Sequence, residues 1–181
     1  MQTEIIARLK AGNLRFTEKV DKAVLQALTK GQHPYAIVIC CSDSRVVPEK
    51  LFSAELGDLF VIRVAGNVLD RHQLGSIEYA AAHLHCPLVL MLGHTGCGAV
   101  EAAVSGAADG FIASITEEIL NAAGFERDRD KVCRLNVLHG VKRIRDAFLE
   151  HPEIGKIEVR GAVYHIETGE TEWLEEPEAD Q

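Results

Sequence analysis

Three short apolar runs restrict the possible folds of this chain more than any other feature of its sequence. They cover residues 35–40, 59–64 and 88–92, and each has the length of a β-strand. Continuous apolar runs of this length are typical of strands that are buried on both faces, as in a parallel sheet. Because helical patterns lie between them, the sequence predicts an α/β fold with a mainly parallel central sheet flanked by helices.

The segments around these runs complete the expected pattern. The clearest amphipathic helix lies at 137–148, where apolar side chains recur at intervals of four, three and four residues. A final pair of strands is expected at 157–166 and 170–174, around a turn with the sequence Thr-Gly. We therefore expect a single domain at 1–174, which begins with a helical arm at 1–30, and an acidic tail at 175–181.

Composition and charge exclude several classes of partner. No apolar stretch reaches the ~18 residues that a transmembrane helix needs, and the first residues do not have the layout of a signal peptide. We therefore expect a cytoplasmic protein with no membrane partner. The formal net charge is −8, and the basic residues form no patch with interleaved aromatic side chains, so no nucleic-acid partner is expected.

The five cysteines direct attention to metal binding, because thiols stay reduced in the cytoplasm. Cys41 follows the first predicted strand, and His94 and Cys97 share the loop after the third. Loops at the carboxyl ends of parallel strands meet at one edge of a sheet. Three such ligands would leave a tetrahedral zinc ion one open position, as in a catalytic site. The alternative at this point is that the cysteines are buried side chains that happen to end strands.

The other cysteines have a structural interpretation. We expect Cys40 to point away from Cys41 and to be a small buried side chain, and we expect the same of Cys86 and Cys133. His83 and His85 lie at a predicted helix end, where histidine complements the helix dipole, so a second metal site is not expected there.

Two loop motifs carry a family resemblance. The sequence Cys-Ser-Asp-Ser-Arg at 41–45 and the sequence His-Thr-Gly-Cys-Gly at 94–98 resemble those of the β-class carbonic anhydrases. Further blocks match the family in the same order, at 63–67, at 76–80, and at 161–164 with 168–169. The resemblance covers roughly residues 30–174. It implies the α/β fold of that family, one zinc ion per chain, and reversible hydration of carbon dioxide to bicarbonate and a proton.

The resemblance also implies the roles of individual residues. Cys41, His94 and Cys97 would bind zinc, and Asp43 and Arg45 would form the catalytic pair. In the family's mechanism a zinc-bound hydroxide attacks the substrate carbon and is oriented by the aspartate, which the arginine holds. Asp43 is also expected as a conditional fourth zinc ligand. A simple salt bridge that fastens the loop is the alternative for the pair.

Gln32, Phe60 and Tyr79 match positions that line the substrate pocket in the plant-like subgroup, and Ala65 and Gly98 are also expected to bind the substrate. Gln32 would donate a hydrogen bond to the substrate, or else satisfy backbone groups before the first strand. Many members of the subgroup have valine where this chain has Ala65, which leaves hydrolysis of carbonyl sulfide or carbon disulfide at the same site as an alternative activity. The resemblance implies a homodimer or a higher homo-oligomer, with the N-terminal helix reaching over the partner and the pocket at their interface.

Overall fold

The computed structural model describes residues 2–149, 151 and 157–175. The chain divides into two compact units, Met1–Gln32 and His33–Gln181. Except for Glu175, the predicted acidic tail at 175–181 lies outside the described residues.

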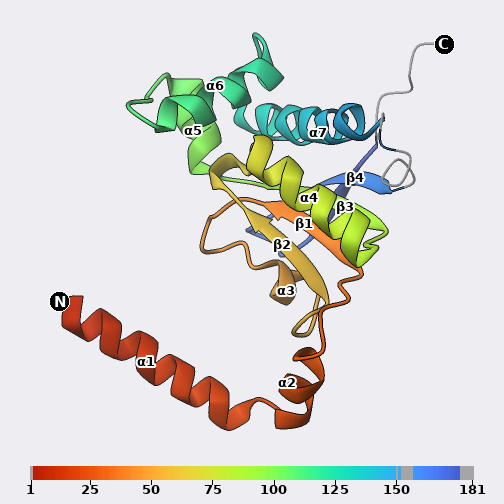
Figure 1. Cartoon of the computed structure of the whole chain (residues 1–181). Coiled ribbons are helices and arrows are strands. Elements are labelled where there is room, and N and C mark those ends of the chain that lie inside the picture. Colours follow the sequence, from red (N-terminus) through yellow and green to blue (C-terminus); the bar gives the residue numbers. More distant parts are fainter. Residues whose placement is uncertain (1, 150, 152–156, 176–181) are drawn as a thin grey trace. The chain divides into compact units, whose positions relative to one another are not determined.

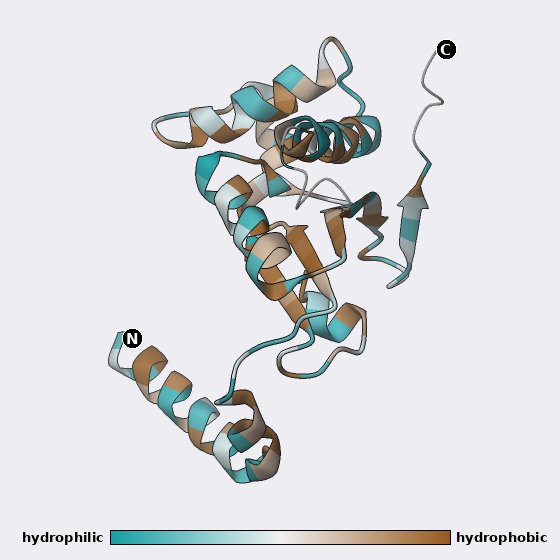
Figure 2. Cartoon of the chain, turned by 45° about the vertical axis from the view of Figure 1, so that its right-hand side comes forward, coloured by the Kyte–Doolittle hydropathy of each residue, from teal (hydrophilic) through white to brown (hydrophobic). Residues whose placement is uncertain are grey.

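The first unit consists of two helices, α1 (Gln2–Lys19) and α2 (Lys22–Leu28). The side chain of Asp21 caps α2 by accepting a hydrogen bond from the amide of Ala23 at 2.8 Å. Neither helix contains a buried residue. Brown apolar segments alternate with teal polar segments along α1 in Figure 2. The segment predicted as a helical arm is thus helical, but the unit has no core of its own.

The second unit is built on one five-stranded sheet with the strand order β2-β1-β3-β4-β5. Its parallel strands are β1 (Ala36–Cys40), β2 (Leu59–Arg63), β3 (Leu88–His94) and β4 (Glu158–Tyr164). The last strand, β5 (Thr171–Leu174), is antiparallel to β4. Every residue of β1 is buried, as expected for a strand covered on both faces. The predicted mainly parallel sheet is therefore confirmed (Figure 1).

Helices cover both faces of this sheet (Figure 1). Their bounds are α3 (Pro48–Leu51), α4 (Arg71–Leu84), α5 (Gly98–Ser105), α6 (Ile112–Ala123), α7 (Arg129–Phe148) and the short 3-10 helix η1 (Ala65–Asn67). The larger core cluster includes buried apolar residues of α4, α5, α6 and α7, and the half-buried Leu51 of α3 packs against the smaller cluster. Cys40 lies in the smaller cluster and Cys41 in the larger, which confirms that they point to opposite faces. No helix in the described part of the chain has the length and apolarity to cross a membrane.

Glycines bring α7 close to the sheet. A Cβ atom on Gly140 of α7 would lie 2.2 Å from the Cε of Met91 in β3. On the strands, a Cβ atom on Gly93 or Gly161 would lie 2.6 Å or 2.8 Å from a methyl group of Val137. A side chain at any of these positions would need the helix or its neighbours to move. This close packing places the first half of α7 directly behind the loop that follows β3.

Candidate metal centre

The loops after β1 and β3 meet at the carboxyl edge of the sheet. These strands are parallel neighbours, and Cys40 lies opposite Leu92. The ligand atoms of Cys41, His94 and Cys97 all lie within 4.8 Å of one another, and the three residues are buried. No other such group of histidine, cysteine and acidic side chains occurs among the residues that the structure describes. The expected convergence of the two loops is therefore confirmed.

The imidazole of His94 is oriented as a metal ligand would be. Its Nδ1 lies 2.9 Å from the carbonyl oxygen of Thr95, which fixes the proton on that nitrogen. Its Nε2 is buried and has no hydrogen-bond partner within the described chain. A buried nitrogen acceptor without a partner is costly. A cation beside the two thiols would supply that partner, so the donor set fits a metal ion.

The two cysteine thiols differ in pKa. The pKa of Cys41 lies well below that of an ordinary thiol, chiefly because Cys97 donates a hydrogen bond to its sulfur. The pKa of Cys97 is raised, first by that same hydrogen bond and then by burial. Thiols bind metals as thiolates, so a divalent cation would take the place of the shared proton. Cys97 also directly precedes α5 as its N-cap residue, where the helix dipole favours negative charge.

Asp43 and Arg45 form a two-pronged ion pair beside this group. Nε and Nη2 of Arg45 donate to the two carboxylate oxygens at 2.9 Å and 2.7 Å. These hydrogen bonds hold the pKa of Asp43 well below its usual range. The same Nη2 lies 3.2 Å from the carbonyl oxygen of Gly96, so Arg45 also connects the two loops. Oδ2 of Asp43, which accepts from Nη2 of Arg45, lies 3.9 Å from Nε2 of His94.

The predicted pocket residues are only partly brought together. The rings of Phe60 and Tyr79 are neighbours, with centroids 6.3 Å apart. Ala65 opens η1, which also contains a residue in contact with Cys41. Gly98 is exposed at the start of α5, and no atom lies within 4 Å of the position of an added Cβ. Gln32 is the last residue of the first unit, so its place in the pocket stays a prediction.

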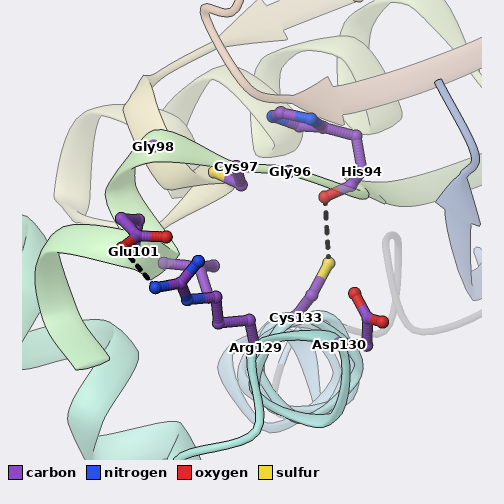
Figure 3. A pocket seen from close by; sticks show the side chains of 9 residues that line it. His94, Gly96, Cys97, Gly98, Glu101, Arg129, Asp130 and Cys133 are labelled. Carbon is purple, nitrogen blue, oxygen red and sulfur yellow. Dashed lines mark hydrogen bonds and ion pairs between the residues drawn. The ribbon is translucent and has the colours of Figure 1, made fainter. Parts of the chain in front are cut away.

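A cavity of about 260 Å³ lies beside the loop after β3. It is bounded by that loop, by α5 and by the start of α7, and includes none of Phe60, Ala65 and Tyr79. Figure 3 shows the ion pair of Glu101 and Arg129 on its rim, and Cys133 beneath the carbonyl oxygen of His94. The cavity therefore lies behind a metal ligand, on the side of α7.

Several residues form hydrogen bonds that fix the loops after β1 and β3, and the sequence analysis did not identify them. Arg63 donates to the carbonyl oxygens of Cys41 and Asp43, at 3.3 Å and 2.7 Å. The thiol of Cys133 donates to the carbonyl oxygen of His94 at 3.3 Å. The hydroxyl of Thr95 donates to Glu167 at 3.0 Å. These contacts join positions far apart in the sequence, and only the parallel register of Arg63 with Cys40 could have suggested one of them.

The cysteines that were expected to be structural are buried. Burial raises the pKa of Cys40 to about 12, and that of both Cys86 and Cys133 to about 11. These thiols therefore stay protonated at neutral pH. The Cys86 thiol donates to the carbonyl oxygen of Pro34 at 3.0 Å, which agrees with its expected structural role.

Comparison with known proteins places the chain among relatives of one kind. A family model described as carbonic anhydrase matches residues 36–171. A carbonic anhydrase from Mycolicibacterium smegmatis is 36% identical over 91% of this chain and 89% of its own length. Carbonic anhydrase 2 from Mycobacterium tuberculosis is 35% identical over 89% of this chain and 87% of its own length.

Solved structures agree with the sequence relatives. The β-carbonic anhydrase CafA of Aspergillus fumigatus is 27% identical, with a TM-score of 0.79 over 97% of this chain and 92% of that one. A structure of one of two tetrameric β-carbonic anhydrases from Sordaria macrospora is 28% identical, with a TM-score of 0.80 over 98% of this chain and 100% of that one.

Proposed function

Because the chain belongs to the β-class carbonic anhydrase family, whose members are zinc lyases, we propose that it hydrates carbon dioxide at a zinc ion held by Cys41, His94 and Cys97. The products are bicarbonate and a proton, and each chain holds one zinc ion. The observation that carries this proposal is the buried cluster of three ligand atoms within 4.8 Å of one another. Three protein ligands leave the open coordination position that a catalytic zinc site needs.

Zinc, when bound, supplies the nucleophile by lowering the pKa of a water molecule in the open position, and two thiolate ligands weaken this effect relative to three neutral histidines. The chain's own residues then orient the reactants. Asp43, whose Oδ2 lies 3.9 Å from Nε2 of His94, would accept a hydrogen bond from the nucleophile. Arg45 keeps the Asp43 carboxylate ionised and holds both of its oxygens, which restrains Asp43 from binding zinc itself.

The substrate is a small apolar molecule, and the proposed pocket suits it. The rings of Phe60 and Tyr79 would give an apolar wall, Gln32 would donate a hydrogen bond to a substrate oxygen, and Ala65 and Gly98 would leave space for the substrate. What supports this assignment is the contact between the two rings and the open space at Gly98. The small side chain of Ala65 also favours a second candidate, hydrolysis of carbonyl sulfide or carbon disulfide at the same site.

We propose that the working form is a homodimer or a higher homo-oligomer in the cytoplasm. The absence of any buried residue in α1 and α2 supports an assembly that covers them. The Sordaria macrospora relatives are tetrameric. Thiols must stay reduced to serve as zinc ligands, and a reducing compartment favours this, which supports the cytoplasmic location.

The test is stopped-flow hydration of carbon dioxide by protein of measured zinc content. We expect about one zinc ion per chain in the wild type. Cys41→Ser, His94→Ala and Cys97→Ser should each lose zinc and activity, because each removes one of three protein ligands. Cys40→Ala is the matched control, since it removes a buried thiol next to a ligand and should keep zinc. Full zinc occupancy in all three ligand variants would overturn the assignment, and rates with carbonyl sulfide and carbon disulfide decide the substrate.

A further inference from the structure

One metal-ligand sulfur is contacted by a backbone amide. The N–H of Gly66 donates a hydrogen bond to Sγ of Cys41 at 3.3 Å, and both residues are buried. Gly66 lies in η1 with φ of +69°, a conformation that favours glycine. A Cβ atom there would lie 2.9 Å from side-chain atoms of both Ala99 and Ile119. The geometry that aims this amide at the sulfur therefore depends on glycine.

A buried asparagine holds Gly66 in this position. Nδ2 of Asn136, on α7, donates to the carbonyl oxygen of Gly66 at 2.8 Å. Asn136 is only 3% exposed, and α7 itself is held against the sheet through the close contact at Gly140. The Asn136 side chain thus fixes one side of Gly66 while the other side contacts the metal ligand.

We propose that Asn136 is a positioning residue that acts through Gly66 on the Cys41 thiolate and reduces the electron density that this sulfur donates to the metal. The proposal rests on the proposed zinc site. A hydrogen bond to a thiolate stabilises its charge and makes it a weaker donor. A metal that receives less charge from its ligands remains a stronger Lewis acid, and groups that contact the ligands tune the metal. Asn136 would thereby offset part of the charge that two thiolates bring.

The simpler interpretation is that Asn136 only satisfies a buried carbonyl group. Buried carbonyl groups do need donors. The two interpretations predict different measurable effects when the Nδ2 donor of Asn136 is removed. A purely structural contact changes stability and leaves the metal–sulfur bonds alone, whereas a positioning contact changes the spectrum of the metal site.

The test compares Asn136→Leu with the wild type, each loaded with cobalt in place of zinc. Leucine has nearly the size of asparagine but no donor. We expect the thiolate-to-cobalt absorption band to move to lower energy, because Cys41 becomes a stronger donor. We also expect zinc to be released to a chelator about tenfold faster, because Gly66 no longer holds the Cys41 sulfur in place. Gly66→Ala disturbs the same contact from its other end and should move the band in the same direction. Ile144→Ala removes buried apolar volume from the second half of α7. It is the control for lost stability and should leave the band unchanged.

If Asn136→Leu does not fold, cadmium NMR on the wild-type protein tests the hydrogen bond from Gly66 to Cys41 directly. In protein loaded with an NMR-active cadmium isotope, the amide proton of Gly66 should show scalar coupling to the metal through Sγ of Cys41. Absence of this coupling, or a folded Asn136→Leu variant with the wild-type cobalt spectrum and zinc release rate, would overturn the proposal. A wild-type protein that binds no zinc would instead refute the proposed function.

Discussion

At the scale of single residues, the Asp43 carboxylate has its charge and its orientation set by one neighbour. Arg45 binds both oxygens, and the amide of Arg45 donates to Oδ1 at 2.9 Å as well. Arg45 is half exposed, with 52% of its side-chain surface accessible, whereas only 16% of the Asp43 side chain is accessible. The arginine is thus anchored by the pair itself and by the carbonyl of Gly96 rather than by burial.

Two substitutions separate the role of the charge on Asp43 from the role of Arg45, which restrains the orientation of the Asp43 side chain. Asp43→Asn keeps the shape of the side chain but cannot be ionised, so it should keep zinc and lower the hydration rate about a hundredfold. Arg45→Ala should keep most of the zinc and lose activity, because Asp43 is then free to rotate onto the metal. X-ray absorption at the zinc edge should show an additional short oxygen ligand in Arg45→Ala. Arg160→Ala, which removes an exposed ion pair with Glu158, is the control and should have the wild-type rate. Wild-type hydration by both site variants would show that the pair only fastens the loop.

At the scale of secondary-structure elements, a charged cluster connects α7 to β5. Arg134 donates to both carboxylate oxygens of Glu172, at 2.5 Å and 2.6 Å, and Nε2 of His165 lies 3.1 Å from the same carboxylate. The hydrogen bonds from Arg134, followed by that from His165, lower the pKa of Glu172 to about 2. The carboxylate is 42% exposed, so solvent screens much of the interaction.

This cluster predicts a pH dependence of stability. The pKa of Glu172 is lower in the folded state than the ordinary glutamate value of 4.5. The ionised carboxylate therefore stabilises the fold above about pH 4.5, and this contribution is lost as the pH falls towards about 2. Urea unfolding midpoints of the wild type and Glu172→Gln, measured across this range, should differ at pH 6 and converge as the pH falls. A difference that stays constant with pH would contradict the assigned pKa.

Replacing a helical glycine by alanine should have opposite effects on stability in α7 and in α4. Gly140→Ala should destabilise the protein by about 1–3 kcal/mol, because the new methyl group would meet Met91 in a filled core. Gly75→Ala in α4 should stabilise it by about 0.5–1 kcal/mol, because the position is helical and open. Chemical denaturation of the two variants measures both values. Equal stabilisation by both substitutions would show that the core yields easily at Gly140.

The elements that the sequence predicted correctly are those with a local signal. The apolar runs became β1, β2 and β3, and the two cysteine-bearing loops converged because parallel neighbouring strands place their carboxyl ends together. Contacts such as that of Asn136 with Gly66 could not be predicted, because their partners are 70 positions apart and a single donor leaves no periodic pattern. The chemistry of a ligand can be read from residue type, but the groups that orient it depend on tertiary packing.

At the scale of the whole molecule, the first unit lacks an apolar core. Several large apolar side chains of α1 are exposed, including Ile5, Ile6, Leu9 and Phe16 at 55%, 53%, 70% and 44%. These four positions recur at helical spacing and share one face of α1. Short helices are marginally stable in water without tertiary packing. A face of this kind needs a cover, and the proposed assembly with a second copy of the chain would supply one.

Charge placed on this face should therefore disrupt the assembly. Leu9→Glu combined with Phe16→Glu would put two carboxylates where apolar contact is expected, and burying unpaired charge is costly. We expect light scattering after size exclusion to show a dimer or larger species for the wild type and a monomer for the double variant. Ala7→Glu adds a carboxylate to the opposite side of α1 and should leave the oligomer intact.

Because the proposed pocket lies between chains, the monomer should also lose hydration activity while keeping the zinc that the second unit holds by itself. An unchanged oligomer in the double variant would show that α1 does not contribute to the interface, and an active monomer would show that the pocket is complete within one chain.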